Sequence, residues 1–288
     1  MILFKPREEL VKQGDYVSRF SVEPNSLEAL YGLPPKVLFC QKCVISNQRP
    51  NSTVEFEHTK VSSKATISFD DNGVCDACRT AEAKKTTIDW QQREAELHAL
   101  CDRYRKKGQG YDCLVPGSGG KDSFYAAHAL KHKYGMNPLT VTWAPHIYTQ
   151  WGWENFQAWI GAGFDNYLMT PNARIHRLIT RLAVENLLHP FQPFMLGQKA
   201  LAPKMAALFD IPLVFYGENE AEYGNPIQGT ETAERDWAYF TSEGDSNIFL
   251  GGVSVTQLQM DFGIQKVDLE PYLPIDPDTV SNKGIQVH

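Results

Sequence analysis

The sequence predicts an α/β protein whose parallel sheet carries helices on both faces, joined to a small cysteine-rich segment near the N-terminus. From residue 111 onward, short apolar runs alternate with stretches in which apolar residues recur at helical spacing. A glycine-rich loop stands between the first of these strands and the first helix, and two Cys-x-x-Cys pairs precede that region. Alternation of strands and helices is typical of parallel sheets, because the crossover helices cover both faces.

Composition limits the class of protein. The chain has 288 residues, a hydrophobic content of 42% and a net charge of −6 at pH 7, which fits a globular chain of one large or two modest domains. No apolar stretch reaches the ~18 residues of a membrane helix, and the start MILFKPREEL has too few apolar residues for a signal peptide. We therefore expect a cytoplasmic protein without membrane insertion. The acidic balance disfavours a nucleic-acid partner, and the basic group at 103–107 fits a solvated helix end.

Three parts are expected along the chain. Residues 1–36 form an N-terminal extension without an assigned role. A four-cysteine metal-binding segment with its linking helix follows at 37–107, and a nucleotide-binding domain occupies 108–288. After about residue 225 the periodic pattern weakens, and the chain ends where apolar alternation begins. We therefore expect a domain that is truncated at its C-terminus.

Within the third part, the elements follow the order of successive strand–helix units. Strands are expected at 111–115, 139–143, 166–169 and 211–216. Helices are expected at 89–107, 123–134, 153–160, 175–188 and 201–209. Loops that follow the strands lie at the carboxyl edge of the sheet, where such folds bind their ligands.

The loop after the first strand reads Ser118-Gly119-Gly120-Lys121-Asp122-Ser123 and leads into a helix. Free N–H groups at a helix N-terminus, together with the positive end of the helix dipole, suit a phosphate. Glycines let the backbone approach the anion, and serines add hydroxyl donors. The sequence of this loop matches neither of two commoner phosphate-binding motifs. The Walker pattern fails because Asp122 follows Lys121, and the dinucleotide pattern fails because Asp122 stands where its last glycine is required.

This hexapeptide resembles the PP-loop of the ATP pyrophosphatases, which cleave ATP between the α and β phosphates and carry the substrate as an adenylate. The resemblance implies that the loop holds the pyrophosphate end of ATP, with Lys121 and Asp122 in catalytic roles and Asp122 near Mg2+. The alternative is a plain turn between a strand and a helix. The residues expected to bind ATP are Gly117, Ser118, Gly119, Gly120, Lys121, Asp122 and Ser123.

An acidic loop follows the strand at 211–216 and carries Glu218, Glu220 and Glu222. Carboxylates beside phosphates usually act through Mg2+, so catalytic roles are expected for Glu218 and Glu222. The alternative is a solvated acidic loop. Substrate-binding roles are expected for Asn219 and Glu220 and, directly before the helix at 201–209, for Gln198 and Lys199. For Gln198 and Lys199 the alternative is a surface role.

Two Cys-x-x-Cys pairs predict a metal site, because each pair presents two thiolates from one tight turn. The expected ligands are Cys40, Cys43, Cys75 and Cys78. A structural Zn2+ is the first interpretation, and an iron–sulfur cluster or two unmetallated pairs are the alternatives. Residues 47–67 are expected to form an inserted hairpin or loop between the pairs. Cys101 and Cys113 lack a partner at ligand spacing, so we expect them in the core or on the surface.

Taken in order, the motifs resemble the N-acetyl sugar amidotransferases, PP-loop enzymes of surface-polysaccharide (lipopolysaccharide O-antigen) and nonulosonic-acid biosynthesis. The segments that carry this resemblance are 40–44, 68–78, 116–123 and 217–220. It implies an ATP-dependent amidotransferase that converts the acetamido group of a nucleotide-activated sugar into an acetamidino group. The amide oxygen would be adenylated, and ammonia would displace AMP.

The source of the ammonia is expected to lie outside the chain. A glutaminase needs an activated cysteine nucleophile, and no cysteine follows Met1 or stands in a Gly-Cys-Gly turn. A separate glutaminase subunit and an ammonia-conducting, cyclase-like subunit are therefore expected as partners. The nearest rival is a PP-loop tRNA-modifying enzyme, either a thiolase or a lysidine-type ligase. A more distant one is a zinc-knuckle binding module whose nucleotide site is regulatory or inactive.

Overall fold

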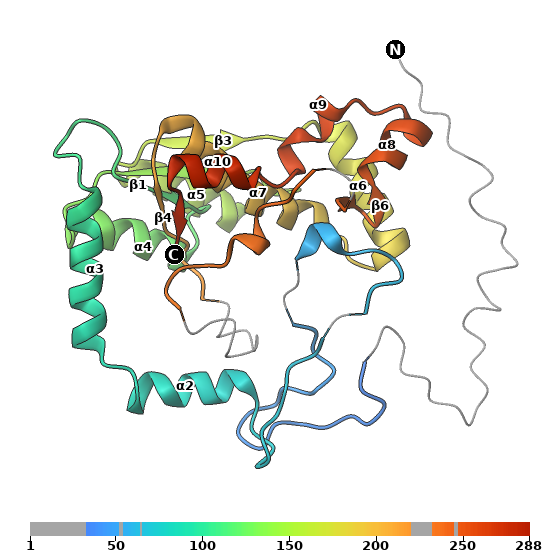
Figure 1. The fold of residues 1–288 in the computed structure, drawn as a ribbon, viewed down its shortest axis with the longest axis horizontal. Helices are drawn as coiled ribbons and strands as arrows, with labels where there is room; N and C mark the ends of the chain where they lie inside the picture. The colour runs from blue at the N-terminus through green and yellow to red at the C-terminus, as the bar shows by residue number, and fades with distance from the viewer. Residues whose placement is uncertain (1–32, 52–53, 64, 220–231, 245–246) are drawn as a thin grey trace, which may run out of the picture.

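The computed structural model describes residues 33–51, 54–63, 65–219, 232–244 and 247–288 (Figure 1). Its centre is a five-stranded sheet in which every pair of neighbours is parallel. In spatial order the strands are β3 (Asn166–Met169), β2 (Pro138–Trp143), β1 (Cys113–Pro116), β4 (Leu213–Val214) and β7 (Gln286–Val287). The predicted α/β class with a parallel sheet is confirmed.

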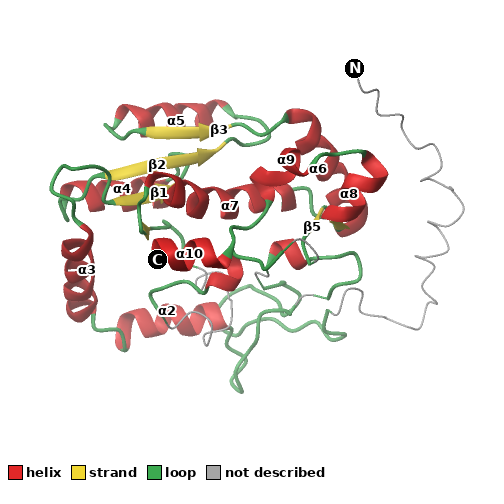
Figure 2. Cartoon of the chain, turned by 45° about the horizontal axis from the view of Figure 1, so that its top comes forward, coloured by secondary structure: helices red, strands yellow, loops and turns green. Residues whose placement is uncertain are grey.

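Helices cover both faces of this sheet (Figure 2). One face packs against α3 (Trp90–Tyr104), α4 (Lys121–His132) and α5 (Gln150–Gly161). The other packs against α6 (Ala173–Leu187), α7 (Gln192–Phe209) and α10 (Pro277–Lys283). None of the helices within the described ranges combines the length and the hydropathy that a membrane span requires.

The two faces follow from the period of two in a β-strand. Leu114 and Val214 point into the larger hydrophobic cluster, whereas Cys113 and Leu213 point into the smaller one, and all four are fully buried. Strands buried on both sides read as continuous apolar runs, which is why the sequence reveals them. Cys101 lies fully buried beside Cys113 in the smaller cluster, so both of these cysteines are core residues.

Helix α7 begins at Gln192, so the prediction of a start at residue 201 is wrong. Proline favours the first turn of a helix, so Pro203 is typical of a helix that starts near residue 201. Instead the helix continues through Pro203. Gln198 and Lys199, which were predicted to precede the helix, consequently lie inside it.

Other boundaries also differ from the expected ones. Helix α2 (Asp76–Thr86) was not predicted, and β4 is shorter than the apolar run at 211–216. The C-terminal region forms α8 (Val255–Phe262), α9 (Lys266–Leu269) and α10 before β7. The two short strands β5 (Phe249–Leu250) and β6 (Val253–Ser254) pair antiparallel and form a separate two-stranded sheet. Among the described residues, 3₁₀ turns occur at η3 (Glu55–Glu57), η6 (Trp237–Tyr239) and η7 (Glu270–Tyr272).

The segment between the two cysteine pairs packs against the sheet domain. Phe56 of η3 is buried in the larger hydrophobic cluster. Gln192, fully buried at the start of α7, donates to the carbonyl of Glu55 at 3.0 Å and accepts from the amide of Gly251 at 3.0 Å. A buried amide with both ends bonded fixes its partners in place. The insertion is therefore anchored to the helix that carries Gln198 and Lys199.

Candidate functional site

The strand order places a crevice between β1 and β4. Chain connections run outward from β1 through β2 to β3 on one side, and β7 lies beyond β4 on the other. The point between two strands whose chain connections run in opposite directions is the switch point of the sheet. Open parallel sheets bind ligands there, outside the carboxyl ends of the strands. A cavity of about 260 Å³ lies at this point, between the loop after β1 and the residues that follow β4. The predicted phosphate loop and the start of the acidic loop therefore meet at one site.

The loop after β1 presents a row of backbone donors. Gly120 is the N-cap residue of α4 and has an extended backbone conformation. Because it has no side chain, it makes no side-chain capping hydrogen bond to the amides of the first turn. Several loop amides donate to no carbonyl of the described residues. They are those of Ser118, Gly119, Gly120, Asp122 and Ser123. Together with the positive end of α4, donors of this kind suit an anion, as the sequence predicts for this loop.

Two glycines allow the loop to pack closely against neighbouring backbone. Gly119 has a φ of 86°, and a Cβ placed there would lie 2.2 Å from the carbonyl oxygen of Asn155 in α5. A Cβ on Gly217 would lie 2.4 Å from the amide nitrogen of Ser123. Because both obstacles are backbone atoms, neither site tolerates a side chain. The loop is thus wedged between α5 and the residues after β4.

The two predicted carboxylates that the structure describes, Asp122 and Glu218, both line the cavity. Lys121 does not line it. Its side chain is 88% exposed, its Nζ lies 2.6 Å from Asp122 Oδ1, and it borders a hollow on the other side of the loop with Gly119 and Asn155. A catalytic role for Lys121 would require its side chain to turn toward the cavity, and that role remains a prediction.

Helix α7 and the C-terminal region supply the opposite wall. Gln198 and Lys199 line the cavity, and the ammonium of Lys199 lies 5.7 Å from the centre of the Tyr239 ring. Arg235 also lines the cavity, with its guanidinium 4.7 Å from the centre of the Tyr216 ring. Sequence reasoning missed Arg235 and Tyr216. Arg235 lies where the periodic pattern is weak, and long-range packing alone brings it to the site.

A second cavity of about 300 Å³ shares a wall with the first, formed by residues 216–218 and Arg235. Glu218 borders both cavities, whereas Asn219 borders only the second, together with Glu234 and Asp236. The other two residues of the predicted acidic loop, Glu220 and Glu222, lie outside the described part of the chain. A ligand in the second cavity would lie directly beside one in the first.

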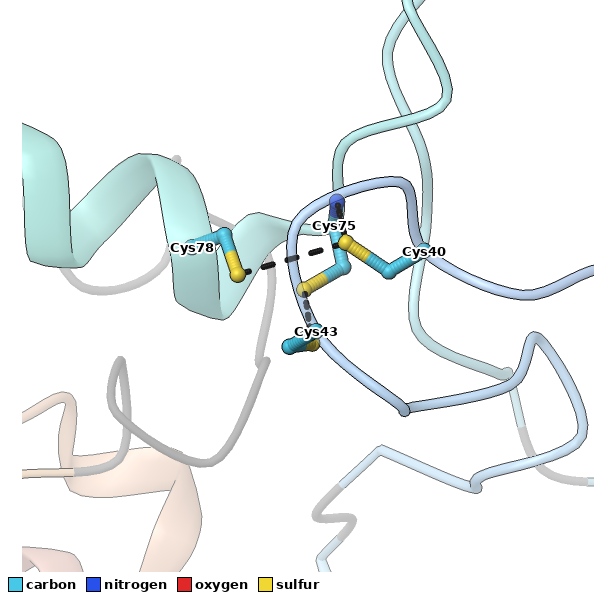
Figure 3. A group of neighbouring side chains, drawn as sticks. All are labelled: Cys40, Cys43, Cys75 and Cys78. Atoms are coloured by element: carbon cyan, nitrogen blue, oxygen red, sulfur yellow. Dashed lines mark hydrogen bonds between the residues drawn. The ribbon is translucent and has the colours of Figure 1, made fainter.

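The four predicted metal ligands come together. Figure 3 shows two of them on one loop and two at the start of α2, with their sulfurs facing a common centre. All four Sγ atoms lie within 4.8 Å of one another. The distance is 4.0 Å from Cys40 to Cys78 and 3.8 Å from Cys43 to Cys75. Four thiolates at ~2.3 Å from one tetrahedral ion are about 3.8 Å apart, so the spacing fits a single ion such as Zn2+.

Electrostatics within this cluster favour a bound cation. Burial raises the pKa of the Cys78 thiol to about 12, and hydrogen bonds with the neighbouring thiols add to the effect. Burial also acts to raise the pKa of Cys40, but N–H donors from Cys75, Lys42 and Cys43 outweigh it and lower this pKa to about 6. Four clustered sulfurs cannot all become thiolates beside one another unless a cation compensates their charge.

Substitution of one ligand tests this centre. Purified protein is expected to hold one zinc per chain, measured by elemental analysis, and Cys75→Ser is expected to lose it with a fall in Tm. Cys101→Ser is the matched control, because it also alters a fully buried cysteine but lies outside the cluster. It is expected to keep the zinc. Iron with acid-labile sulfide in the wild-type protein would instead establish an iron–sulfur centre.

Comparison with known proteins gives partial likenesses. No protein-family model matches the chain. An uncharacterized protein from Methanocaldococcus jannaschii is 32% identical over 84 residues, which are 29% of this chain and 29% of that protein. The match thus spans less than a third of the length of this relative.

Two solved structures are similar to part of the chain. One is an NH3-dependent NAD synthetase from Campylobacter jejuni in complex with nitrate, with a TM-score of 0.35, 18% identity, and coverage of 47% of this chain and 59% of the synthetase. Another is a predicted subunit of a tRNA methyltransferase from Methanocaldococcus jannaschii, with a TM-score of 0.27, 17% identity, and coverage of 60% and 73%. Likenesses of this size leave the reaction and the substrate to be decided by the residues of the site.

Proposed function

We propose that the protein is an ATP-dependent amidotransferase that converts the acetamido group of a nucleotide-activated N-acetyl sugar into an acetamidino group. One observation carries the ATP part of this proposal. The donor-rich loop after β1 and the carboxylates of Asp122 and Glu218 line one cavity at the switch point of the sheet. Amides suit phosphates and carboxylates suit Mg2+. The sugar and the ammonia rest on the resemblance of the cysteine, loop and acidic motifs to the N-acetyl sugar amidotransferases.

The chemistry follows from the poor leaving ability of an amide oxygen. In the proposed first step, this oxygen attacks the α-phosphorus of ATP, the α–β bond breaks, pyrophosphate leaves, and the amide nitrogen loses its proton. The product is an O-adenylyl imidate. Ammonia then adds to the imidate carbon, and AMP leaves with the former amide oxygen to give the amidine. The loop amides would hold the departing pyrophosphate, and Asp122 with Glu218 would hold Mg2+, which neutralises phosphate charge.

The remaining site residues receive roles by their positions. Lys199 and Arg235 lie on the wall opposite the loop and would bind substrate or phosphate oxygens. Asn219 and Glu218 reach the second cavity, where we place the sugar, because it adjoins the phosphate site. Gln198, Glu220 and Glu222 keep their predicted roles. A cytoplasmic location, a separate glutaminase subunit and an ammonia-conducting subunit belong to the same proposal.

A tRNA substrate is less compatible with the charges of the site. RNA-binding surfaces neutralise phosphates with several Lys and Arg residues, whereas the second cavity is bordered by one such residue, Arg235, and by the carboxylates of Glu218, Glu234 and Asp236. The net charge of −6 points the same way. The tRNA-modifying alternative therefore enters as an outcome of the test.

A product assay separates the two. With ATP, Mg2+, ammonium and a panel of UDP- and CMP-linked N-acetyl sugars, we expect sustained formation of equal amounts of AMP and pyrophosphate with one sugar. Mass spectrometry should show the acetamidino product. Omission of ammonium should stop turnover. AMP formation with bulk tRNA, and with none of the sugars, would overturn the amidotransferase assignment in favour of RNA modification.

A further inference from the structure

We infer that Thr142 is a positioning residue that keeps the first peptide of the phosphate loop in its anion-binding orientation. The inference rests on the proposed role of residues 118–123 as a phosphate site. Thr142 lies on β2, next to β1, and is fully buried. Its hydroxyl donates to the carbonyl oxygen of Gly117 at 2.6 Å.

Because a peptide unit is planar, the hydrogen bond from Thr142 to Gly117 also fixes the direction of the N–H of Ser118. The carbonyl of Gly117 and the N–H of Ser118 belong to one planar trans peptide unit, so they point in opposite directions. With the carbonyl tied to β2, the N–H of Ser118 faces away from β2. Ser118 lines the cavity, and its amide donates to no carbonyl within the described ranges. The Thr142 hydroxyl thereby aims this N–H at the position of the anion.

The hydrogen bond from Thr142 is needed because residue 117 is a glycine. Without a Cβ, glycine crosses backbone barriers that hold other residues in one conformation. Rotation of the 117–118 peptide would replace a donor with a carbonyl oxygen at the phosphate site, and this oxygen would repel the anion. The preceding peptide is already held, since the amide of Gly117 donates to the carbonyl of Val141 at 2.9 Å. Thr142 fixes the peptide that follows.

A neighbouring side chain sets the direction of the threonine hydroxyl. The amide nitrogen of Asn166 on β3 donates to Thr142 Oγ1 at 3.0 Å and to Thr140 Oγ1 at 2.9 Å. Each hydroxyl therefore accepts from Asn166 and is left to donate its own hydrogen. Thr142 donates to the loop, whereas Thr140 donates to the carbonyl of Asp165 at 2.8 Å. The two threonine hydroxyls thus share a donor, Asn166, and bond different carbonyls.

Because Thr140 and Thr142 both accept from Asn166 and donate to a carbonyl, Thr140 supplies a matched control for Thr142. Thr142→Val and Thr140→Val each remove one fully buried hydroxyl, keep the shape of the side chain and leave one Asn166 hydrogen without its acceptor. We expect Thr142→Val to weaken binding of inorganic pyrophosphate and of MgATP by about three- to tenfold, the effect of one hydrogen bond. Thr140→Val is expected to bind like the wild type with a similar fall in Tm. Thr142→Ser, which keeps the hydroxyl, is expected to restore most of the affinity.

Calorimetric titration with pyrophosphate and with MgATP decides between the outcomes. If the wild type binds neither, the proposed function fails and this inference fails with it. If the wild type binds both and the two valine variants bind equally well at comparable Tm, the positioning role alone is overturned. Should Thr142→Val not fold, Thr142→Cys and Thr140→Cys take the places of the valine pair, because a thiol is a weak donor of similar volume.

Discussion

Asp122→Asn is expected to lower the rate of pyrophosphate release by about 100- to 1000-fold, the loss seen when one preorganised electrostatic contact to a reacting group is removed. Asp122 lies in the first turn of α4 and lines the first cavity, where we place the phosphates. Asparagine keeps the shape of the side chain but removes the charge that would hold Mg2+ between the loop and the phosphates. The measurement is steady-state pyrophosphate release with saturating ATP and acceptor.

The matched control is Asp278→Asn. Asp278 is likewise an exposed acidic residue in the first turn of a helix, α10, but it borders neither cavity. Both substitutions remove a favourable interaction with a helix dipole, worth ~0.3–1 kcal/mol of stability. Only Asp122→Asn should affect turnover. An Asp122→Asn protein that releases pyrophosphate at the wild-type rate would show that this carboxylate plays no part in the chemistry.

Gly217→Ala is expected to abolish ATP binding within the range that calorimetry detects. The added Cβ would lie 2.4 Å from the amide nitrogen of Ser123 and 2.5 Å from the carbonyl carbon of Asp122. Real Cβ atoms do not approach backbone this closely, so the start of α4 and the phosphate loop must move. Donors displaced by about 1 Å no longer match the oxygens of a phosphate.

Gly161→Ala tests whether this loss is specific. Gly161 ends helix α5, and a Cβ there would meet nothing within 4 Å. Alanine is also the better helix former, so this control should bind ATP normally with an unchanged or slightly higher Tm. Normal ATP affinity in Gly217→Ala would contradict the close packing of the two loops that forms the site.

The sequence predicts the sheet better than its surroundings. β1 and β2 are buried apolar runs whose hydrophobicity is a local signal. Helix α2 gives no such signal, because Asp76 is its one residue described as buried and the rest of its surface has no apolar stripe. The start of α7 was missed because Pro203 mimics the first turn of a helix. The first failure reflects a missing local signal, and the second reflects a local signal that tertiary packing overrides.

The site shows the same contrast between residues that carry a local signal in the sequence and residues placed by long-range packing. The meeting of the loop after β1 with Glu218 at one cavity was predicted because a short motif and a strand end specify both positions locally. Arg235 depends on packing between segments far apart in the chain, and no local pattern marks it. Thr142 did carry a signal, as one of two threonines in an otherwise apolar buried strand. A hydroxyl in such a place needs a hydrogen-bond partner, and here the partner is the loop.

Transfer of an isotopic label tests the central claim most directly. The acceptor sugar identified in the product assay would be prepared with 18O in its acetamido carbonyl and incubated with the protein, ATP, Mg2+ and ammonium. If the amide oxygen attacks the α-phosphorus, the label appears in AMP, pyrophosphate stays unlabelled, and the sugar product contains an amidine. Unlabelled AMP, or ADP and phosphate as the products, would contradict adenylation of the amide at this loop.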